Sequence, residues 1–394
     1  MLTMLCDVTR PALSMEPPSY ISKVSISSTT LDLGKGESVR IQYSLDREAP
    51  ATIRIYDAEH CIVRTVAQGR PSFAGMNTVS WDGLDDAGHP VPDEVYYFTI
   101  TCTDRQGRTA SYDPPTFSGG EQIAFSTRDM RHDPAAKAVV YHLSRPARVQ
   151  IRAGVREGPL LKTIADWAPR QPGRYMEPWD EKDKSGVVNV TTLKNWNLIG
   201  RAYTLPENSI SVTGGPTRAA EVKKPPMPEQ ERALPSTQVR AEALKRATLI
   251  ESTLAQRTRP IDPHVWTPFG KNASPRFRIS LAETKSAAGS ETIRAESATT
   301  VPTETPTVSG LIGIQVTMDE TTRLRLQEQR FEIVAYVDYQ LIGEQEQGYS
   351  PYTYVLDTTT FPNGEHVVTI NVAGLQDQLS AESLKIKIHN PGSR

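Results

Sequence analysis

The chain has 394 residues and a formal net charge of -2, with 44 lysine and arginine residues against 46 aspartate and glutamate residues. This balance excludes the basic face of an ordinary nucleic-acid-binding domain, and the length suits about three domains. No apolar run reaches the roughly twenty residues that a membrane-spanning helix needs. The sequence therefore predicts a multi-domain protein with no transmembrane segment.

Residues 1–19 contain prolines and no apolar periodicity, so we expect an N-terminal tail. Met1–Cys6 is apolar, but it is too short for a signal peptide and lacks the basic start of one. The three cysteines do not suggest a disulfide framework, and Cys102 is expected to be a small buried side chain.

Residues 20–116 carry short apolar runs separated by turn residues, which is the pattern of a β-sandwich. The clearest stretch is 79–98, where a strand, an acidic turn with glycines and a second strand follow one another. Alternation predicts that the second strand points four side chains inward, namely Tyr96, Phe98, Ile100 and Cys102. The structural motif before and within the turn consists of Trp81, Asp82, Gly83, Asp85, Asp86 and Gly88.

The motif recurs 98 residues later, which predicts a second, diverged copy of the module over residues 117–215. The recurring motif residues are Trp179, Asp180 and Gly186. The strand at 52–55 aligns with 148–151 at an offset of 96, which implies two residues lost and later regained. Beyond Gly186 the similarity decays, and the last strand of the copy is expected at 209–212.

The Trp-Asp-Gly sequence, the Asp-Asp-Ala-Gly turn and the Val-Tyr-Tyr-Phe strand resemble the immunoglobulin-like module of the flagellar hook-capping protein D. The resemblance covers residues 20–105 well and 120–215 weakly. Glu94 stands where that module usually has glycine, and Glu181 replaces the glycine that follows Trp179-Asp180. The resemblance implies a β-sandwich used for assembly or display, with no active site to transfer.

Residues 216–275 read as a proline-rich linker that contains one amphipathic helix. Its apolar stripe repeats at three- and four-residue steps through Val239, Ala243, Ala247, Ile250 and Leu254. A lone helix of this length is marginal in water. We therefore expect the stripe to dock on a neighbouring domain or on another protein.

Residues 276–394 show strand signals again and resemble a bacterial immunoglobulin-like domain of a different subtype, with a tight turn at Asn363-Gly364. The Ser/Thr/Ala/Glu-rich residues 284–306 are expected to be a mobile insertion. The expected strands are 312–316, 331–337, 352–356, 367–372 and 384–388.

Candidate chemistry is sparse. The aspartates of the first acidic turn could surround a calcium ion, but bonding to nearby backbone amides is the favoured hypothesis. The histidines are not spaced as metal ligands, and no nucleophile elbow, phosphate loop or dinucleotide motif occurs. A sugar-stacking face is conceivable, but core packing is the favoured use of its four aromatic residues, Trp167, Tyr175, Trp179 and Trp196. We expect no enzyme activity, metal, cofactor or small-molecule ligand.

These patterns favour an all-β protein of serial immunoglobulin-like sandwiches that is a non-catalytic structural or assembly subunit. Its expected place is a bacterial cell-envelope or extracellular complex, where sandwich edges and the linker would bind partner protein subunits. Two alternatives stay open: a flagellar hook-cap-like assembly scaffold, and a carbohydrate-binding accessory protein.

Overall fold

The computed structural model forms two compact units, and both consist of β-sandwiches. The first unit holds the first module, made of residues 20–57, 61–118 and 207–216. The second unit holds the second module, residues 119–206, and a third domain that begins at Ser274. The residues that the structure describes are 20–58, 61–123, 125, 129–216, 274–282, 305–327, 331–374 and 378–391. The predicted all-β fold is confirmed.

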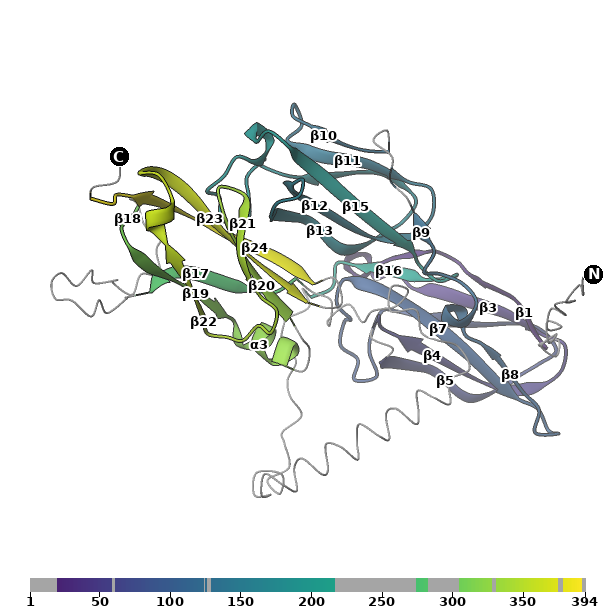
Figure 1. Ribbon diagram of the computed structural model, residues 1–394. Coiled ribbons are helices and arrows are strands. Elements are labelled where there is room, and N and C mark those ends of the chain that lie inside the picture. The colour runs from purple at the N-terminus through teal and green to yellow at the C-terminus, as the bar shows by residue number, and fades with distance from the viewer. Residues whose placement is uncertain are drawn as a thin grey trace, which may run out of the picture. The chain divides into compact units, whose positions relative to one another are not determined.

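The first module consists of two sheets with the strand orders β1-β3-β6 and β2-β16-β7-β4-β5, and β8 also pairs with β7 (Figure 1). The strands are β1 (Ile21–Ile26), β2 (Thr30–Asp32), β3 (Val39–Leu45), β4 (Ala49–Tyr56), β5 (Ile62–Ser72), β6 (Gly75–Trp81), β7 (Glu94–Thr103), β8 (Thr109–Tyr112) and β16 (Ile210–Thr213). Two 3-10 turns complete it, η1 (Leu33–Lys35) and η2 (Pro114–Thr116).

The core of the first module follows from the two-residue period of its strands. The predicted inward face of β7 is confirmed, because its four side chains are at most 2% exposed and belong to the core cluster. Trp81 closes the core at 1% exposure, with its indole ring 5.3 Å from the ring of Tyr96 in an edge contact. Cys102 is buried as expected, and Cys61 is exposed.

One strand of the first module lies beyond the second module in the sequence. The strand expected at 209–212 as the end of the second module is β16 of the first, so that expectation was wrong. Ile210 lies opposite Tyr96 of β7, and the other edge of β16 runs parallel to β2. The reason is that β8 covers only the half of β7 that begins at Ile100. The other half of that edge would otherwise present unpaired backbone groups.

The second module is therefore an insertion in the first, rather than the next module in a row. The chain leaves the first unit at Ser118 and returns at Glu207, whose backbone N–H donates a hydrogen bond to Ser118 Oγ at 2.9 Å. The two connections run side by side at this point. In Figure 1 the teal strand β16 accordingly lies among the blue and purple strands of the first module.

The second module has the strand orders β10-β11-β14 and β13-β12-β15-β9. The first of these sheets repeats β1-β3-β6, and β13-β12-β15 repeats β5-β4-β7, but the next strand along the larger sheet is β9 instead of β16. Its elements are β9 (Gln122–Ile123), β10 (Met130–Asp133), β11 (Ala138–Leu143), β12 (Ala147–Val155), β13 (Leu160–Arg170), β14 (Gly173–Pro178), η3 (Val190–Thr192) and β15 (Trp196–Thr204). Its core cluster is separate from that of the first module.

The register corrects the predicted offset of 96 for one strand. The first module has a bulge where Ala51 pairs with Arg70 and Ile53 with Ala67, and the second has the same bulge at Val149 and Ile151. Both positions are 98 residues apart. The sequences of β4 and β12 are short and apolar, so they can be aligned with a shift of two residues. The position of the bulge shows which alignment is correct.

The third domain is a sandwich with the strand orders β17-β19-β22 and β18-β24-β23-β20-β21. Its elements are β17 (Phe277–Ala282), β18 (Thr307–Val308), β19 (Leu311–Met318), α3 (Glu320–Gln327), β20 (Phe331–Val337), β21 (Gln340–Gln345), β22 (Tyr352–Asp357), η5 (Thr358–Thr360), β23 (Gly364–Gly374) and β24 (Leu379–Ile388). Every predicted strand lies within an observed one. Helix α3 was not predicted, although Asp319 caps it by accepting the Thr322 N–H at 2.7 Å.

Within the second unit, the third domain packs on the end of strand β13. The side chain of Asn371, 4% exposed, accepts the Leu160 N–H at 3.0 Å and donates to the Leu160 carbonyl at 2.9 Å. Lys184 pairs with Glu382 at 2.8 Å, and Ser185 Oγ donates to the same carboxylate at 2.6 Å. The second module and the third domain are thus joined by hydrogen bonds and an ion pair that involve both backbone and side-chain groups.

Several predictions fall on residues outside the described ranges: the N-terminal tail, the linker with its helical stripe, and most of the insertion expected at 284–306. No helix among the described residues is long and apolar enough to cross a bilayer.

Candidate functional site

The acidic turn of the first module is built by side chains that bond their own backbone. Asp82 Oδ1 accepts the Leu84 N–H at 3.1 Å, and the Trp81 indole N–H donates to the Leu84 carbonyl at 3.0 Å. Asp85 Oδ1 accepts the N–H groups of His89 at 2.8 Å and Ala87 at 2.9 Å. The hydrogen bond from the His89 N–H is the largest cause that lowers the pKa of Asp85, and the Ala87 N–H lowers it further. Burial acts in the opposite direction, but the pKa stays below its ordinary value.

Asp86 forms hydrogen bonds with the outer edge of strand β5 instead of with the turn itself. Its N–H donates to the Val63 carbonyl at 2.9 Å, and its Oδ1 accepts the Thr65 N–H at 2.9 Å. An exposed strand edge is a template for unwanted pairing, and this turn blocks part of it. Among the described residues, no group of three or more His, Cys, Asp or Glu side chains is placed to hold a metal ion.

The two glycines of the turn differ in what surrounds them. Gly83 and Gly88 both have positive φ, 77° and 79°. A Cβ added at Gly83 would lie 2.3 Å from Leu33 Cδ2, whereas one at Gly88 would meet nothing within 4 Å. Gly83 is therefore required by both conformation and space, and Gly88 by conformation alone.

This difference gives a matched pair of variants. We expect Gly88→Ala to lower the free energy of unfolding of the first module by about 1 kcal/mol, the cost of a left-handed alanine. Gly83→Ala adds a steric overlap with a side chain of the core, so we expect a loss of about 3 kcal/mol. Urea denaturation of both variants measures the difference, and equal losses would contradict the steric argument.

The second copy of the turn reproduces the hydrogen bonds of Trp81 and Asp82, and its Asp183 accepts two backbone N–H groups as Asp85 does. The Trp179 indole N–H donates to the Lys182 carbonyl at 2.9 Å, and Asp180 Oδ1 accepts the Lys182 N–H at 3.1 Å. Asp183 Oδ1 accepts the Val187 and Val188 N–H groups, and Gly186 has a φ of 72°. Asp183 was not among the predicted motif residues. It lies 98 residues after Asp85, so the repeat spacing could have identified it.

The position of Gly83 is occupied in the second copy by Glu181, which keeps a positive φ of 67°. Its carboxylate lies 3.1 Å from His132 Nε2. The His132 ring makes edge contacts with the rings of Trp179 and Trp196, at 5.4 and 5.6 Å. The glycine-to-glutamate difference is visible in the sequence, but the contact of Glu181 with His132 is not, because the two residues are far apart in the chain.

The four aromatic residues considered as a sugar-stacking face do not all lie in the same surroundings. Trp179, Trp196 and Tyr175 all belong to or pack against the core cluster of the second module. Trp167 is not in that cluster, and its ring lies 5.6 Å from the ring of Tyr203. Core packing, the favoured hypothesis, describes three of the four.

The predicted turn of the third domain is held by hydrogen bonds between Asn363 and Asn390. Asn363 Oδ1 accepts the Asn390 N–H at 2.7 Å, and its amide donates to the Asn390 carbonyl at 3.2 Å. Gly364 follows with a φ of 148°. His366 Nδ1 lies 2.6 Å from Asp338 Oδ2, which ties the turn to the loop between β20 and β21. The docking stripe predicted at 239–254 lies outside the described residues.

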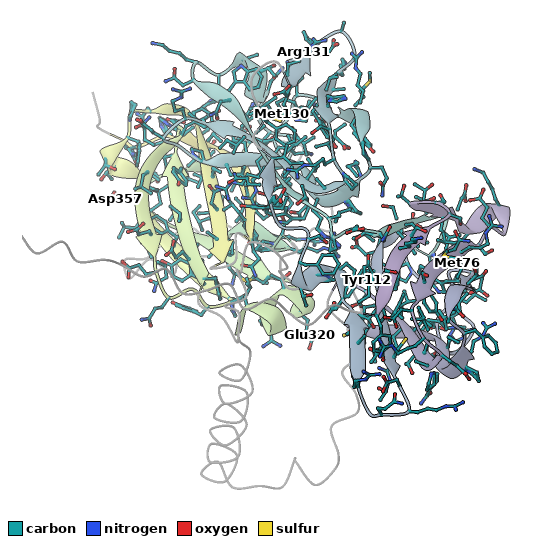
Figure 2. All side chains as sticks on the ribbon, turned by 90° about the vertical axis from the view of Figure 1, so that its right-hand side faces the viewer. Met76, Tyr112, Met130, Arg131, Glu320 and Asp357 are labelled. Atoms are coloured by element: carbon teal, nitrogen blue, oxygen red, sulfur yellow. The ribbon has the colours of Figure 1, made fainter. Side chains whose placement is uncertain are left out.

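Two exposed apolar residues, Phe73 in the turn after β5 and Met76 at the start of β6, distinguish the first module from the second. Phe73 is 67% exposed and Met76 is 59% exposed. Met76 is labelled in Figure 2. The side chain of Asn77 fixes the turn by bonding the backbone of Phe73 at 2.8 and 3.2 Å and the Gly75 carbonyl at 3.0 Å. At the matching positions, 98 residues on, the second module has Gln171 and Arg174. The difference between the two copies at these positions is visible in the sequence, so this pair could have been predicted from it.

The turn motif and the sandwich around it agree with a known family. Residues 28–106 match the family model of the FlgD Ig-like domain. The FlgD Ig-like match lies within the first module and contains its acidic turn. No curated protein sequence matches the chain.

Solved structures give distant likenesses. FlgD from P. aeruginosa is 20% identical, with 24% of this chain and 70% of that chain covered and a TM-score of 0.19. A 1.5-MDa bacterial ice-binding adhesin is 8% identical, with 95% and 98% covered and a TM-score of 0.18. The FN1-FN3 domains of chicken CNTN1 are 9% identical, with 94% and 99% covered and a TM-score of 0.17. At such low TM-scores these likenesses say nothing about function.

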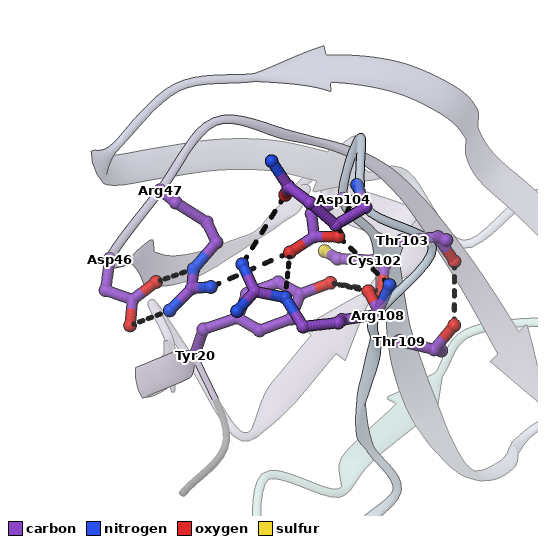
Figure 3. A network of polar contacts seen from close by, with 9 residues as sticks. Tyr20, Asp46, Arg47, Cys102, Thr103, Asp104, Arg108 and Thr109 are labelled. Atoms are coloured by element: carbon purple, nitrogen blue, oxygen red, sulfur yellow. Dashed lines mark hydrogen bonds and ion pairs between the residues drawn. The ribbon is translucent and has the colours of Figure 1, made fainter.

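Strand β7 is followed by a polar network that anchors the start of the first module (Figure 3). Tyr20 donates to the carbonyls of Cys102 at 2.6 Å and Arg108 at 3.0 Å. Asp104 accepts Arg108 Nε at 2.8 Å, and Arg47 lies 3.6 Å from the same carboxylate. Burial opposes ionisation of Asp104, but Arg108 and the turn amides outweigh it and hold its pKa below the ordinary value.

A pH dependence follows from Asp104. Because its pKa is lower in the folded state than in the unfolded state, its contribution to stability is present above about pH 4 and is lost as the pH falls through the folded pKa. We expect Asp104→Asn to lower the melting temperature at pH 7 and to change it much less at pH 2.5. Thermal unfolding at both pH values tests this, and an equal loss at both would contradict it.

Proposed function

We propose that this protein is a non-catalytic structural or assembly subunit of a bacterial cell-envelope or extracellular complex. Three β-sandwiches in one chain and the FlgD Ig-like match support it. The bonded turns support it as well, because the acidic residues singled out by the sequence are engaged in holding loops.

The observation that carries the proposal is the turn of Phe73 and Met76. Both side chains are exposed, Phe73 in the turn and Met76 at the start of strand β6, and Asn77 fixes the backbone of the turn. Large exposed apolar side chains in a rigid loop are typical of protein contacts, because little conformational entropy is lost on binding. The second module has polar residues at the same turn, so the repeat itself does not require apolar ones. We propose this turn as the main contact with partner subunits.

The proposal predicts the behaviour of a double variant. Phe73→Ser with Met76→Ser should abolish co-purification of the partner subunits from the native source, with little change in melting temperature because both side chains are exposed. Arg174→Ser, at the matching turn of the second module, is the control and should retain the partners. A wild-type chain that purifies as a lone monomer after cross-linking in cells would contradict the proposal.

The apolar stripe at Val239–Leu254 is the second contact that we propose, from its helical spacing alone. Replacing Ala247 and Ile250 with glutamate should weaken the same complex. If it does not, the stripe has another role.

A flagellar hook-cap-like scaffold is the alternative, favoured by the FlgD Ig-like match at 28–106. It predicts that the purified chain binds flagellar hook subunits and changes their polymerisation. Light scattering of hook subunits with and without the chain separates the two proposals. The carbohydrate-binding alternative has no such observation in its favour.

A further inference from the structure

The third domain binds the second module at two neighbouring places. The first is the start of strand β13, where Leu160 is buried and the side chain of Asn371 bonds both of its backbone groups. The second is the second copy of the acidic turn, where Lys184 and Ser185 both reach the carboxylate of Glu382. A strand start and a turn together therefore form the surface on which this β-sandwich sits.

The first module has the same surface with the same local geometry. The strand pairing puts Ile62 at the position of Leu160, at the repeat spacing of 98 residues. The Asp86 N–H donates to the Val63 carbonyl at 2.9 Å, and Lys184 makes the matching bond to strand β13 at the same distance. The strand start and the turn are thus held together in the same way in both modules.

In the first module this surface is open. Ile62 is 51% exposed, against 9% for its counterpart Leu160. Asp86 and Ala87 are exposed as well, and so is Cys61, which precedes Ile62. A single exposed isoleucine would mean little by itself. Here it is the counterpart of a residue that a β-sandwich covers, and the turn beside it is the counterpart of a turn that binds the same sandwich.

We propose that the surface of Ile62, Asp86 and Ala87 binds a β-sandwich domain of another protein, as the second module binds the third domain. The charge of the surface specifies the partner. The second module offers a lysine to Glu382, whereas the first offers the carboxylate of Asp86 at the same position. The partner therefore carries a lysine or arginine where the third domain has Glu382.

A second copy of this chain does not fit the surface. The matching face of its third domain is already bound to its own second module through Asn371 and Glu382. It would also bring Glu382 against Asp86, and like charges at a contact oppose binding. The occupant is therefore a different subunit.

This inference rests on the proposed function, because it requires partner subunits, but it concerns a separate contact. Ile62 begins strand β5, whereas Phe73 follows the other end of that 11-residue strand. The two contacts can therefore be tested independently of each other.

Photo-cross-linking of the full chain in cells of the native source tests the inference. Benzoylphenylalanine at position 62 should form an adduct with a β-sandwich domain of another protein, and mass spectrometry should place the linked peptide beside a lysine or arginine. The control is the same probe at Ser25, which is exposed on strand β1 and should not give this adduct. Adducts only between copies of this chain, adducts only with proteins that lack a β-sandwich, or no adduct would each overturn the inference.

A charge change at the turn provides a second test. Ala87→Arg should lower the yield of the position-62 adduct about tenfold, because the new positive charge repels the basic residue of the partner. Ala87→Ser, which introduces the residue of the second copy, should leave the yield unchanged. Equal yields for both variants would overturn the charge argument and with it the partner that we assign. If partners co-purify but position 62 gives no such adduct, this inference alone fails, whereas a lone monomer would reject the proposed function as well.

Discussion

Replacing Ile210 with Asn is expected to unfold the first module, although residue 210 follows the second module in the sequence. Ile210 is fully buried in the core of the first module, opposite Tyr96. The variant loses the packing of a large side chain and buries an amide without a partner. Together these cost on the order of 4 kcal/mol, a large part of the stability of a single domain.

Hydrogen exchange locates the effect. Protection should fall at Tyr96–Ile100 of strand β7 and be retained at Val149–Ile151 of the second module. Thr213→Asn is the matched control, since Thr213 ends the same strand but is exposed. Loss of protection in the second module instead would mean that the strand belongs there, as the sequence alone predicted.

Local features of the fold were predictable because they depend on neighbours in sequence. The alternation in β7 follows from the pleat of a strand, and the acidic turn from the tendency of aspartate to bond the next amides. The repeat at 98 residues predicted that Trp179 and Asp180 would act like Trp81 and Asp82, and their hydrogen bonds are the same.

Partners that are distant in sequence were not predictable. The pattern of Ile210 and Val212 indicates a strand, but it does not say which sheet takes it. That choice depends on how much of β7 is left open by β8, which is a property of the folded module. His132 and Glu181 meet for the same kind of reason. The exposed pair of Phe73 and Met76 could have been found by comparing the two copies position by position.

Replacing Asn371 with Leu should loosen the third domain from the second module. The Asn371 amide is the hydrogen-bond partner of both the N–H and the carbonyl of Leu160, and all of these groups are buried. Leucine has a similar volume and cannot bond either group. Two backbone groups would then be buried unsatisfied, at about 1–3 kcal/mol each, so we expect a loss of about 3 kcal/mol from the second unit.

The measurement is thermal unfolding together with the exchange rate of the Leu160 amide. Lys385→Leu serves as the control, because Lys385 is exposed on the neighbouring strand β24. It should leave both quantities nearly unchanged. An Asn371→Leu variant whose Leu160 amide stays protected at the wild-type level would mean that the amide contact contributes little, and that the ion pair of Lys184 and Glu382 holds the two sandwiches together.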